Sequence, residues 1–252
     1  MSRMQTWNWV IRVKPMHKTF RMTGKFKNTT MKKTLFLFLL SISIHTLGQE
    51  HLIGVQGGLN LTNITDNAFF DNSNTKTGFI GGINYTIKIS DRYQIGVDAL
   101  YAQQGYISKF IAIEEYGHQT GVEDSKFNHD YFSLPLKIGY EMGEKIKIIP
   151  WIGLVPSFLI KAESIIPRFD DSGNVIGHET VNARYAISKF DFGGLLELGF
   201  ESRLTSNLFF CPALTYRHSL STFSNSNYFE DSKIRHYGLS IAVGMKYRLK
   251  TR

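Results

Sequence analysis

The sequence of 252 residues contains a single cysteine, Cys211, and beyond residue 44 nothing close to a long apolar run. One cysteine excludes an intramolecular disulfide, and no cysteine and histidine grouping has the spacing of a zinc site. A membrane-spanning helix needs about 20 apolar residues, so that class is excluded as well. We therefore expect no cofactor and no metal centre. If the chain crosses a membrane, it must do so as a closed β-barrel, because lipid cannot satisfy an open sheet edge.

Acidic residues are absent from residues 1–48, which hold nine of the 29 basic residues. The remainder carries 20 basic against 21 acidic residues, so the formal net charge of +8 comes from this leader. A basic surface would attract nucleic acid or anionic membranes. The rest of the chain has no such excess, and we predict no nucleic-acid partner.

A secretory signal peptide is predicted at residues 31–48. Two lysines follow Met31, an apolar run covers 35–44, and Thr46 and Gly48 place small residues at the −3 and −1 positions of a cut. The apolar run is too short to span a bilayer. The alternative is a buried N-terminal helix.

The signal divides the chain into three predicted parts. Residues 1–30 precede a complete signal and are interpreted as a mis-assigned start or an extended leader. Residues 49–252 form the mature domain, and this length suits one all-β domain.

The last predicted strand, residues 234–249, has two chemically different faces, because successive side chains of a strand point to opposite sides. Odd positions from Tyr237 onward are large and apolar, whereas even positions are small or charged. Tyr237 and Tyr247 lie ten residues apart. At about 3.3 Å per residue and a tilt near 40°, they span about 25 Å, the height of an outer-membrane apolar band between its aromatic girdles.

A soluble eight-stranded barrel, such as a lipocalin, would also alternate. Its large apolar side chains would fill a closed interior, and Gly238, Ala242 and Gly244 would then face water. The opposite assignment, with small and charged residues inside and large ones facing lipid, fits both faces. We therefore predict a lipid-facing barrel.

Seven further runs alternate in the same way, which gives the even strand count of single-chain bacterial barrels. They cover residues 52–63, 77–89, 93–106, 131–142, 146–161, 190–204 and 208–220. The connections at 90–92, 143–145 and 205–207 are short, and those at 64–76, 107–130, 162–189 and 221–233 are long and polar. Short periplasmic turns and long outer loops are typical of such barrels. The prediction is an all-β, eight-stranded antiparallel up-and-down transmembrane β-barrel with periplasmic termini.

Four prolines fall inside the predicted strands: Pro135, Pro150, Pro156 and Pro212. A closed barrel has no edge at which a missing N–H donor is harmless, so we expect β-bulges at these positions. The fifth run contains Trp151 and is apolar on both faces, which leaves its orientation open.

Several strand segments carry a family resemblance: residues 131–140 (YFSLPLKIGY), 150–153 (PWIG), 192–201 and 214–218 (LTYRH). In these the chain resembles the PorT-like outer-membrane β-barrel family of Bacteroidota, over about residues 49–249. The resemblance implies the barrel fold, contact with outer-membrane lipid and insertion by the barrel assembly machinery. PorT belongs to a secretion machine, but most relatives have no known activity, so the resemblance assigns no role in secretion.

Charged residues of the predicted strands gather on the inward face. They are Lys88, Asp98, Lys137, Glu141, Asp191, Glu197, Glu201, Arg203, Arg217, Lys246 and Arg248. An eight-stranded barrel is just wide enough for its own side chains, so these charges must pair or leave water-filled gaps. We predict a structural ion-pair network. The alternative is a gated conduit or a proton path.

His218, Ser219 and Ser221 near the predicted outer rim suggest a lipid or peptide hydrolase or acyltransferase. Such a site needs nucleophile, base and orienting group within hydrogen-bond reach, and the sequence shows no such convergence. We predict a girdle histidine and no catalytic residue. Three functions remain: a structural or binding role through long extracellular loops with an outer or periplasmic protein partner, a secretion accessory, and a rim enzyme.

Overall fold

The computed structural model describes residues 50–65, 73–113, 119–170, 172–224 and 233–249. The predicted signal peptide and the residues before it lie outside these ranges. Within them all regular structure is β-strand. The same residues contain no helix of the length and apolarity needed to cross a bilayer.

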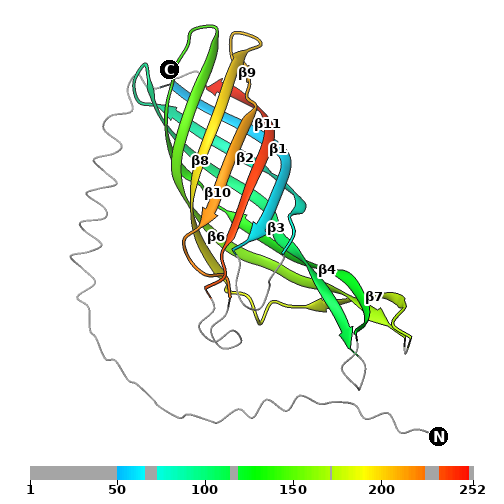
Figure 1. Cartoon of the computed structure of the whole chain (residues 1–252). Coiled ribbons are helices and arrows are strands. Elements are labelled where there is room, and N and C mark those ends of the chain that lie inside the picture. Colours follow the sequence, from blue (N-terminus) through cyan, green and yellow to red (C-terminus); the bar gives the residue numbers. More distant parts are fainter. Residues whose placement is uncertain (1–49, 66–72, 114–118, 171, 225–232, 250–252) are drawn as a thin grey trace, which may run out of the picture. The chain divides into compact units, whose positions relative to one another are not determined.

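Eleven strands form one antiparallel sheet (Figure 1). They are β1 (Glu50–Ile64), β2 (Lys76–Lys88), β3 (Tyr93–Ile113), β4 (Gln119–Ser133), β5 (Leu136–Tyr140), β6 (Ile146–Phe169), β7 (Val175–Asn182), β8 (Phe190–Arg203), β9 (Leu208–Phe210), β10 (Ala213–Ser219) and β11 (His236–Leu249). Eight strand positions close into a ring, in which β4 with β5 and β9 with β10 each share one position. The predicted all-β, eight-stranded barrel is confirmed.

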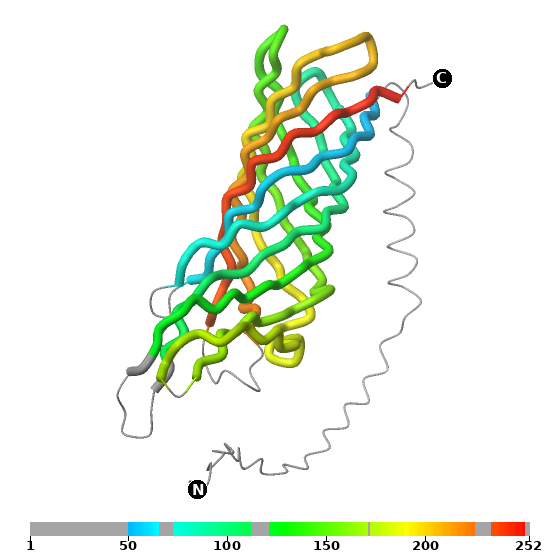
Figure 2. The backbone as a smooth tube through the Cα atoms, turned by 90° about the vertical axis from the view of Figure 1, so that its right-hand side faces the viewer, coloured from blue at the N-terminus to red at the C-terminus, as the bar shows by residue number. Residues whose placement is uncertain are grey.

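The ring closes where the first and last strands meet. β1 and β11 pair from His51 opposite Leu249 to Ile64 opposite His236, and Figure 2 shows them side by side in blue and red. Ile241 of β11 is 56% exposed on the outside, whereas its neighbour Ser240 is 7% exposed on the inside. The inward small and outward apolar faces of this strand are therefore as predicted.

The short turns gather at one end of the barrel. The turns after β2, β5 and β8 lie there together with the start of β1 and the end of β11. Gly143, in the turn between β5 and β6, has a φ of +91°, a conformation that residues with a Cβ rarely adopt. We call this the short-turn end and the opposite end the mouth.

Two of the predicted long polar loops, 107–130 and 162–189, are largely strands, so that part of the prediction was wrong. β3 continues to Ile113, β4 begins at Gln119, β6 continues to Phe169, and β7 follows it. The two-residue alternation reports a strand only when its two faces meet different environments, which in this ring are lipid and the lumen. Beyond the apolar band both faces meet water, so polar residues occupy both and the signal disappears.

The expected bulges at the prolines were also wrong. Pro135 and Pro212 fall in breaks between strands, where their carbonyls accept hydrogen bonds from the N–H groups of Asp98 (3.0 Å) and Phe200 (2.8 Å). Pro150 and Pro156 lie within β6, which keeps an unbroken register with β8. A short break in the strand therefore accommodates a proline that has no N–H to donate, while its carbonyl still accepts a hydrogen bond from the neighbouring strand.

Candidate functional site

The inward side chains fill the lumen at successive levels from the short-turn end to the mouth. At the short-turn end, Glu141 accepts from Lys88 at 2.9 Å and also pairs with Lys147. Glu50 pairs with Arg248. The predicted set of lumenal charges did not include Glu50 and Lys147, although Lys147 occupies an inward position of the fifth predicted run.

The middle level is centred on Lys137. Its Nζ lies 2.8 Å from both Asp98 Oδ2 and Glu197 Oε1. It also lies 5.1 Å from the ring centroid of Trp151, and Lys246 Nζ lies 5.6 Å from that ring. The two carboxylates and the aromatic face together compensate the buried ammonium group.

Trp151 therefore points into the lumen, which settles the orientation that the sequence left open. Its ring occupies the space beside glycines of neighbouring strands. A Cβ at Gly139 would lie 2.5 Å from the ring, and one at Gly199 would lie 3.0 Å from the indole nitrogen. The first distance is too short for a Cβ contact and the second is tighter than most, so the inward glycines make room for the indole.

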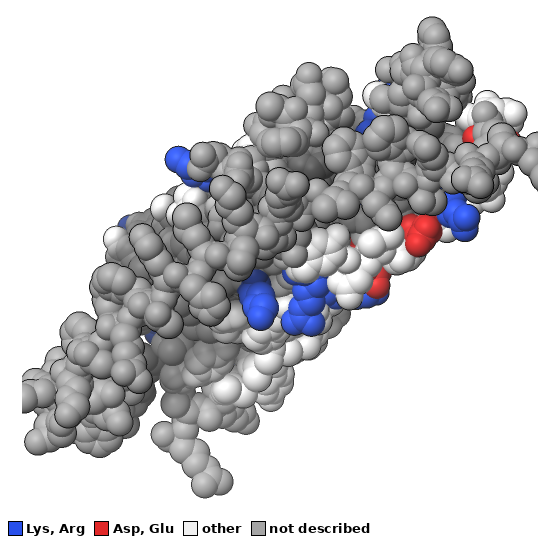
Figure 3. Space-filling model, turned by 90° about the horizontal axis from the view of Figure 1, so that it is seen from below, with Lys and Arg blue, Asp and Glu red and all other residues white. Residues whose placement is uncertain are grey.

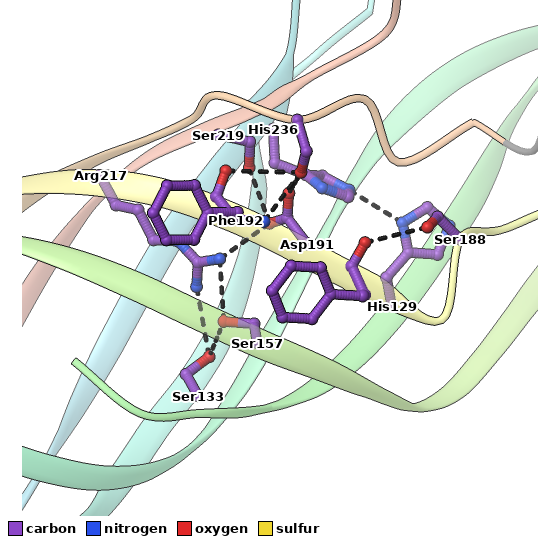
Figure 4. Close-up of polar contacts among 11 residues, drawn as sticks. His129, Ser133, Ser157, Ser188, Asp191, Phe192, Arg217, Ser219 and His236 are labelled. Carbon is purple, nitrogen blue, oxygen red and sulfur yellow. Dashed lines mark hydrogen bonds and ion pairs between the residues drawn. The ribbon is translucent and has the colours of Figure 1, made fainter. Parts of the chain in front are cut away.

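Asp191 forms the third level, nearer the mouth (Figure 4). Its side chain is fully buried and accepts from Arg217, Ser219 and Ser221, each at 2.8 Å. The carboxylate thus has three donors, which is how a buried charge is compensated.

The Arg217 guanidinium also donates to Ser157 at 3.1 Å and to Ser133 at 3.3 Å. A cavity of about 50 Å³ lies between this level and the Lys137 level, lined in part by Asp98, Glu197 and Arg217. At about 10–15 Å³ per water, this cavity holds a few water molecules and no organic solute.

Three of the predicted lumenal residues form no ion pair within the described ranges. Lys246 lies over Trp151 instead. Arg203 is exposed and donates to the carbonyls of Thr205 and Ser206. Glu201 is buried, with Arg203 near it in the lining of a vestibule of about 470 Å³ at the short-turn end.

The mouth is closed by a mainly apolar cluster that the sequence did not reveal. It consists of Ile64, Tyr106, Tyr131, Leu159, Ala162, Ile187, Phe223 and Ile234, and we call it the mouth plug. Among its side chains His129 Nδ1 lies 2.9 Å from His236 Nε2, and the Phe223 ring stacks on His236 with centroids 4.0 Å apart. Both histidines occupy inward positions, but their meeting depends on strands far apart in sequence.

The residues of the rim-enzyme alternative do not converge. The His218 ring lies on the outer surface between Tyr216 and Tyr237, with ring centroids 6.5 and 6.4 Å away. Ser219 points inward to Asp191. The structure thus places the base and the nucleophile on opposite faces of one strand. Within the described ranges no cluster of three or more His, Cys, Asp or Glu side chains could hold a metal ion.

Three ring strands, β3, β4 and β6, continue past the mouth, and β7 pairs with the end of β6 to complete a sheet there (Figure 1). This projecting sheet comprises residues 102–113, 119–130, 161–169 and β7. Tyr101 is an exposed outward aromatic at the upper edge of the apolar band, and its hydroxyl donates to Asp130 at 2.7 Å. From Tyr101, β3 runs for a further 12 residues, about 40 Å at about 3.3 Å per residue.

The projecting sheet carries aromatic pairs on the face that continues the lumen. Tyr106 stacks on Phe127 with centroids 4.5 Å apart, and Phe110 stacks on Phe169 at 6.2 Å. A Cβ at Gly121 would lie 2.6 Å from the Phe169 ring, so this glycine admits the stack. Viewed from the mouth side, both basic and acidic side chains occur among the described residues (Figure 3).

The turn between β6 and β7 is held by Asp170. Its carboxylate accepts from the backbone N–H groups of Asn174 (2.8 Å) and Ser172 (2.9 Å). These hydrogen bonds, with those from Asn174 dominant, hold the pKa of the Asp170 carboxyl below its ordinary value. β7 therefore has a fixed start next to β6.

The closed ring, its apolar outer band and its charged lumen define an outer-membrane β-barrel protein. The family model described as outer membrane protein beta-barrel domain matches residues 47–225. The chain belongs to this family.

Solved outer-membrane proteins are similar to the chain at low sequence identity. A major outer membrane protein from Thermus thermophilus is 14% identical, with a TM-score of 0.51, covering 80% of this chain and 100% of that one. The outer membrane protein OprG from Pseudomonas aeruginosa is 12% identical, with a TM-score of 0.44, covering 80% and 97%. No curated protein matches the chain.

Proposed function

We propose that this protein is a non-enzymatic binding protein of the outer membrane. The barrel is a closed anchor with periplasmic termini, and the projecting sheet is the extracellular binding surface. The sheet carries this proposal, because β3 continues for 12 residues past Tyr101, about 40 Å of strand length, far more than is needed to connect barrel strands. The lumenal charges serve the anchor as a structural ion-pair network, in which Lys137 bridges the carboxylates of Asp98 and Glu197.

A role as an accessory of a protein secretion system is the second candidate. It comes from the sequence resemblance of residues 131–140 and 214–218 to the PorT-like family, which by itself assigns no role in secretion. A gene deletion distinguishes the two candidates. Loss of the gene would deplete the secretome if the protein is a secretion accessory, and would leave it unchanged if the protein is only a binding protein.

We expect the isolated barrel to conduct poorly in a planar bilayer. Ion-paired side chains fill the lumen, and the mouth plug closes one end. Single-channel recordings should show no large stable open state, with a general porin in the same membrane as the control. A steady conductance comparable to that of the porin would refute the closed lumen.

Removing the projecting sheet should abolish partner binding and leave the barrel folded. Residue pairs opposite each other define where to cut: Ile107 lies opposite Lys126, and Glu163 lies opposite Asn182. Replacing 108–125 and 164–181 with Asn-Gly turns closes both hairpins in their existing register.

The measurement is capture of surface partners by the trimmed and the full barrels in native outer membranes, with heat-dependent gel mobility as the test of folding. A Glu144→Gln variant, changed in a turn at the other end, is the matched control and should capture as the wild type does. Equal capture by a folded trimmed barrel would refute the proposed function.

A further inference from the structure

One edge of the projecting sheet is open. Among the described strands β7 pairs with β6 alone. Its side chains are all exposed or half-buried along the strand. An open edge presents a row of backbone N–H and C=O groups without strand partners.

The hydrogen-bond pattern shows which groups of β7 point outward. The N–H of Ala183 donates to the carbonyl of Ala162 at 3.0 Å, one pair beyond Glu163 and Asn182. Antiparallel pairs alternate between hydrogen-bonded and non-hydrogen-bonded. The backbone groups of Val181 therefore face β6, and those of Asn182 face away.

The same alternation extends along the strand. Val181 and Glu179 bond to β6, whereas the N–H and C=O groups of Thr180 and His178 point to the open edge. Pro167 lies opposite His178 in a non-hydrogen-bonded pair, where neither residue has to donate an N–H across the two strands. The proline thus fits the assignment independently.

The open edge has only part of the usual protection, because Glu179 is its one acidic side chain and the register shift with β6 lies at its start, between Arg168 and Phe169. Proteins block exposed edges with lysine, proline or a covering segment. β7 contains neither lysine nor proline, and its Ile176 is 61% exposed. The other edge of the projecting sheet differs, because Asn74 bridges Ile107 there and Lys109 follows.

We propose that β7 docks an extended polypeptide segment of a partner protein as an additional strand. The proposal rests on the binding function above and names the class of partner. Main-chain hydrogen bonds to His178, Thr180 and Asn182 supply the affinity. Side chains beside Ile176 and Thr180 favour β-branched or aromatic residues at alternate positions of the segment.

A second copy of the chain fits this edge less well than a peptide does. The edge is eight residues long. A stable interface between two folded proteins buries about 1,000 Å² or more, which one short edge pairing does not provide. A flexible segment needs only the edge itself and the side chains that flank it.

The test uses the full mature barrel in lipid nanodiscs and a fluorescent ten-residue peptide of alternating valine and threonine with a lysine at each end. The Thr180→Pro variant removes an outward N–H and leaves the bonds to β6 intact. Thr180→Ala is the matched control, because it keeps that N–H. We expect Thr180→Pro to bind the peptide at least tenfold more weakly than Thr180→Ala, since the two variants lack the same hydroxyl side chain and differ in the outward N–H of residue 180.

Hydrogen exchange supplies the second measurement. Saturating peptide should slow exchange of the amides of His178 and Thr180, and the amide of Val181 should stay protected in the proline variant. If that protection is lost, His178→Pro replaces it as the test. Unchanged binding by both proline variants, no binding by the wild type, or protection of His178 and Thr180 that appears without peptide as protein concentration rises would each overturn the proposal. If only the trimmed barrel loses its partners, the binding function stands and the β7 assignment fails.

Discussion

An Asp191→Ala variant should lose about 3–5 kcal/mol of folded stability, because it leaves the largely enclosed Arg217 guanidinium without its carboxylate. Asp191 is fully buried, and Arg217 Nη2 lies 2.8 Å from it. The hydroxyl groups of Ser219 and Ser221 also lose their acceptor. Urea unfolding in detergent micelles measures the loss. Trp151, the only tryptophan after residue 48, reports on the lumen by its fluorescence.

The matched control replaces both charges, as Asp191→Leu with Arg217→Met. Removing a buried pair together is often neutral or stabilising, whereas removing one partner is not. The double variant should therefore recover most of the lost stability. A single variant as stable as the wild type would mean that water in the adjacent cavity solvates Arg217, and that the ion pair contributes little.

The ring could be predicted from sequence because the bilayer imposes a two-residue period on each strand. Ile241 and Ser240 show that signal at its clearest, one facing lipid and the other the lumen. β7 lies outside the band, and none of its side chains is fully buried. The sequence pattern places these residues in a loop, because nothing in it distinguishes a strand with two solvent-exposed faces from a loop.

The inward charges could be predicted individually, but their partners could not. Which carboxylate meets Lys137 depends on the stagger of strands around the ring, and Asp98 and Glu197 come from strands on either side of it. The period of a single strand contains no such information. The same limit hid the meeting of His129 and His236, which are 107 residues apart.

The Ile241→Arg substitution places a charge near the middle of the apolar band, since Ile241 is 56% exposed on the outer surface. We expect a loss of about 2–4 kcal/mol in membrane-folded stability, the cost of arginine near a bilayer midplane. Ile241→Leu should be tolerated. Ala242→Ser, one residue along on the inward face, should cost far less than the arginine. Unfolding from lipid vesicles in denaturant gives all four stabilities.

That substitution alone does not identify the solvent outside the barrel, because a core position of a soluble barrel would also reject arginine. Single cysteines at Tyr237, Ile241 and Ser240 in a Cys211→Ser background resolve this when each carries a fluorophore. Lipid-phase quenchers should reach labels at 237 and 241, more deeply at 241, and miss the one at 240. The reason is that β11 alternates between lipid and lumen at each residue. Quenching at 240 but not at 241 would reverse the two faces and leave the protein without a membrane-facing surface.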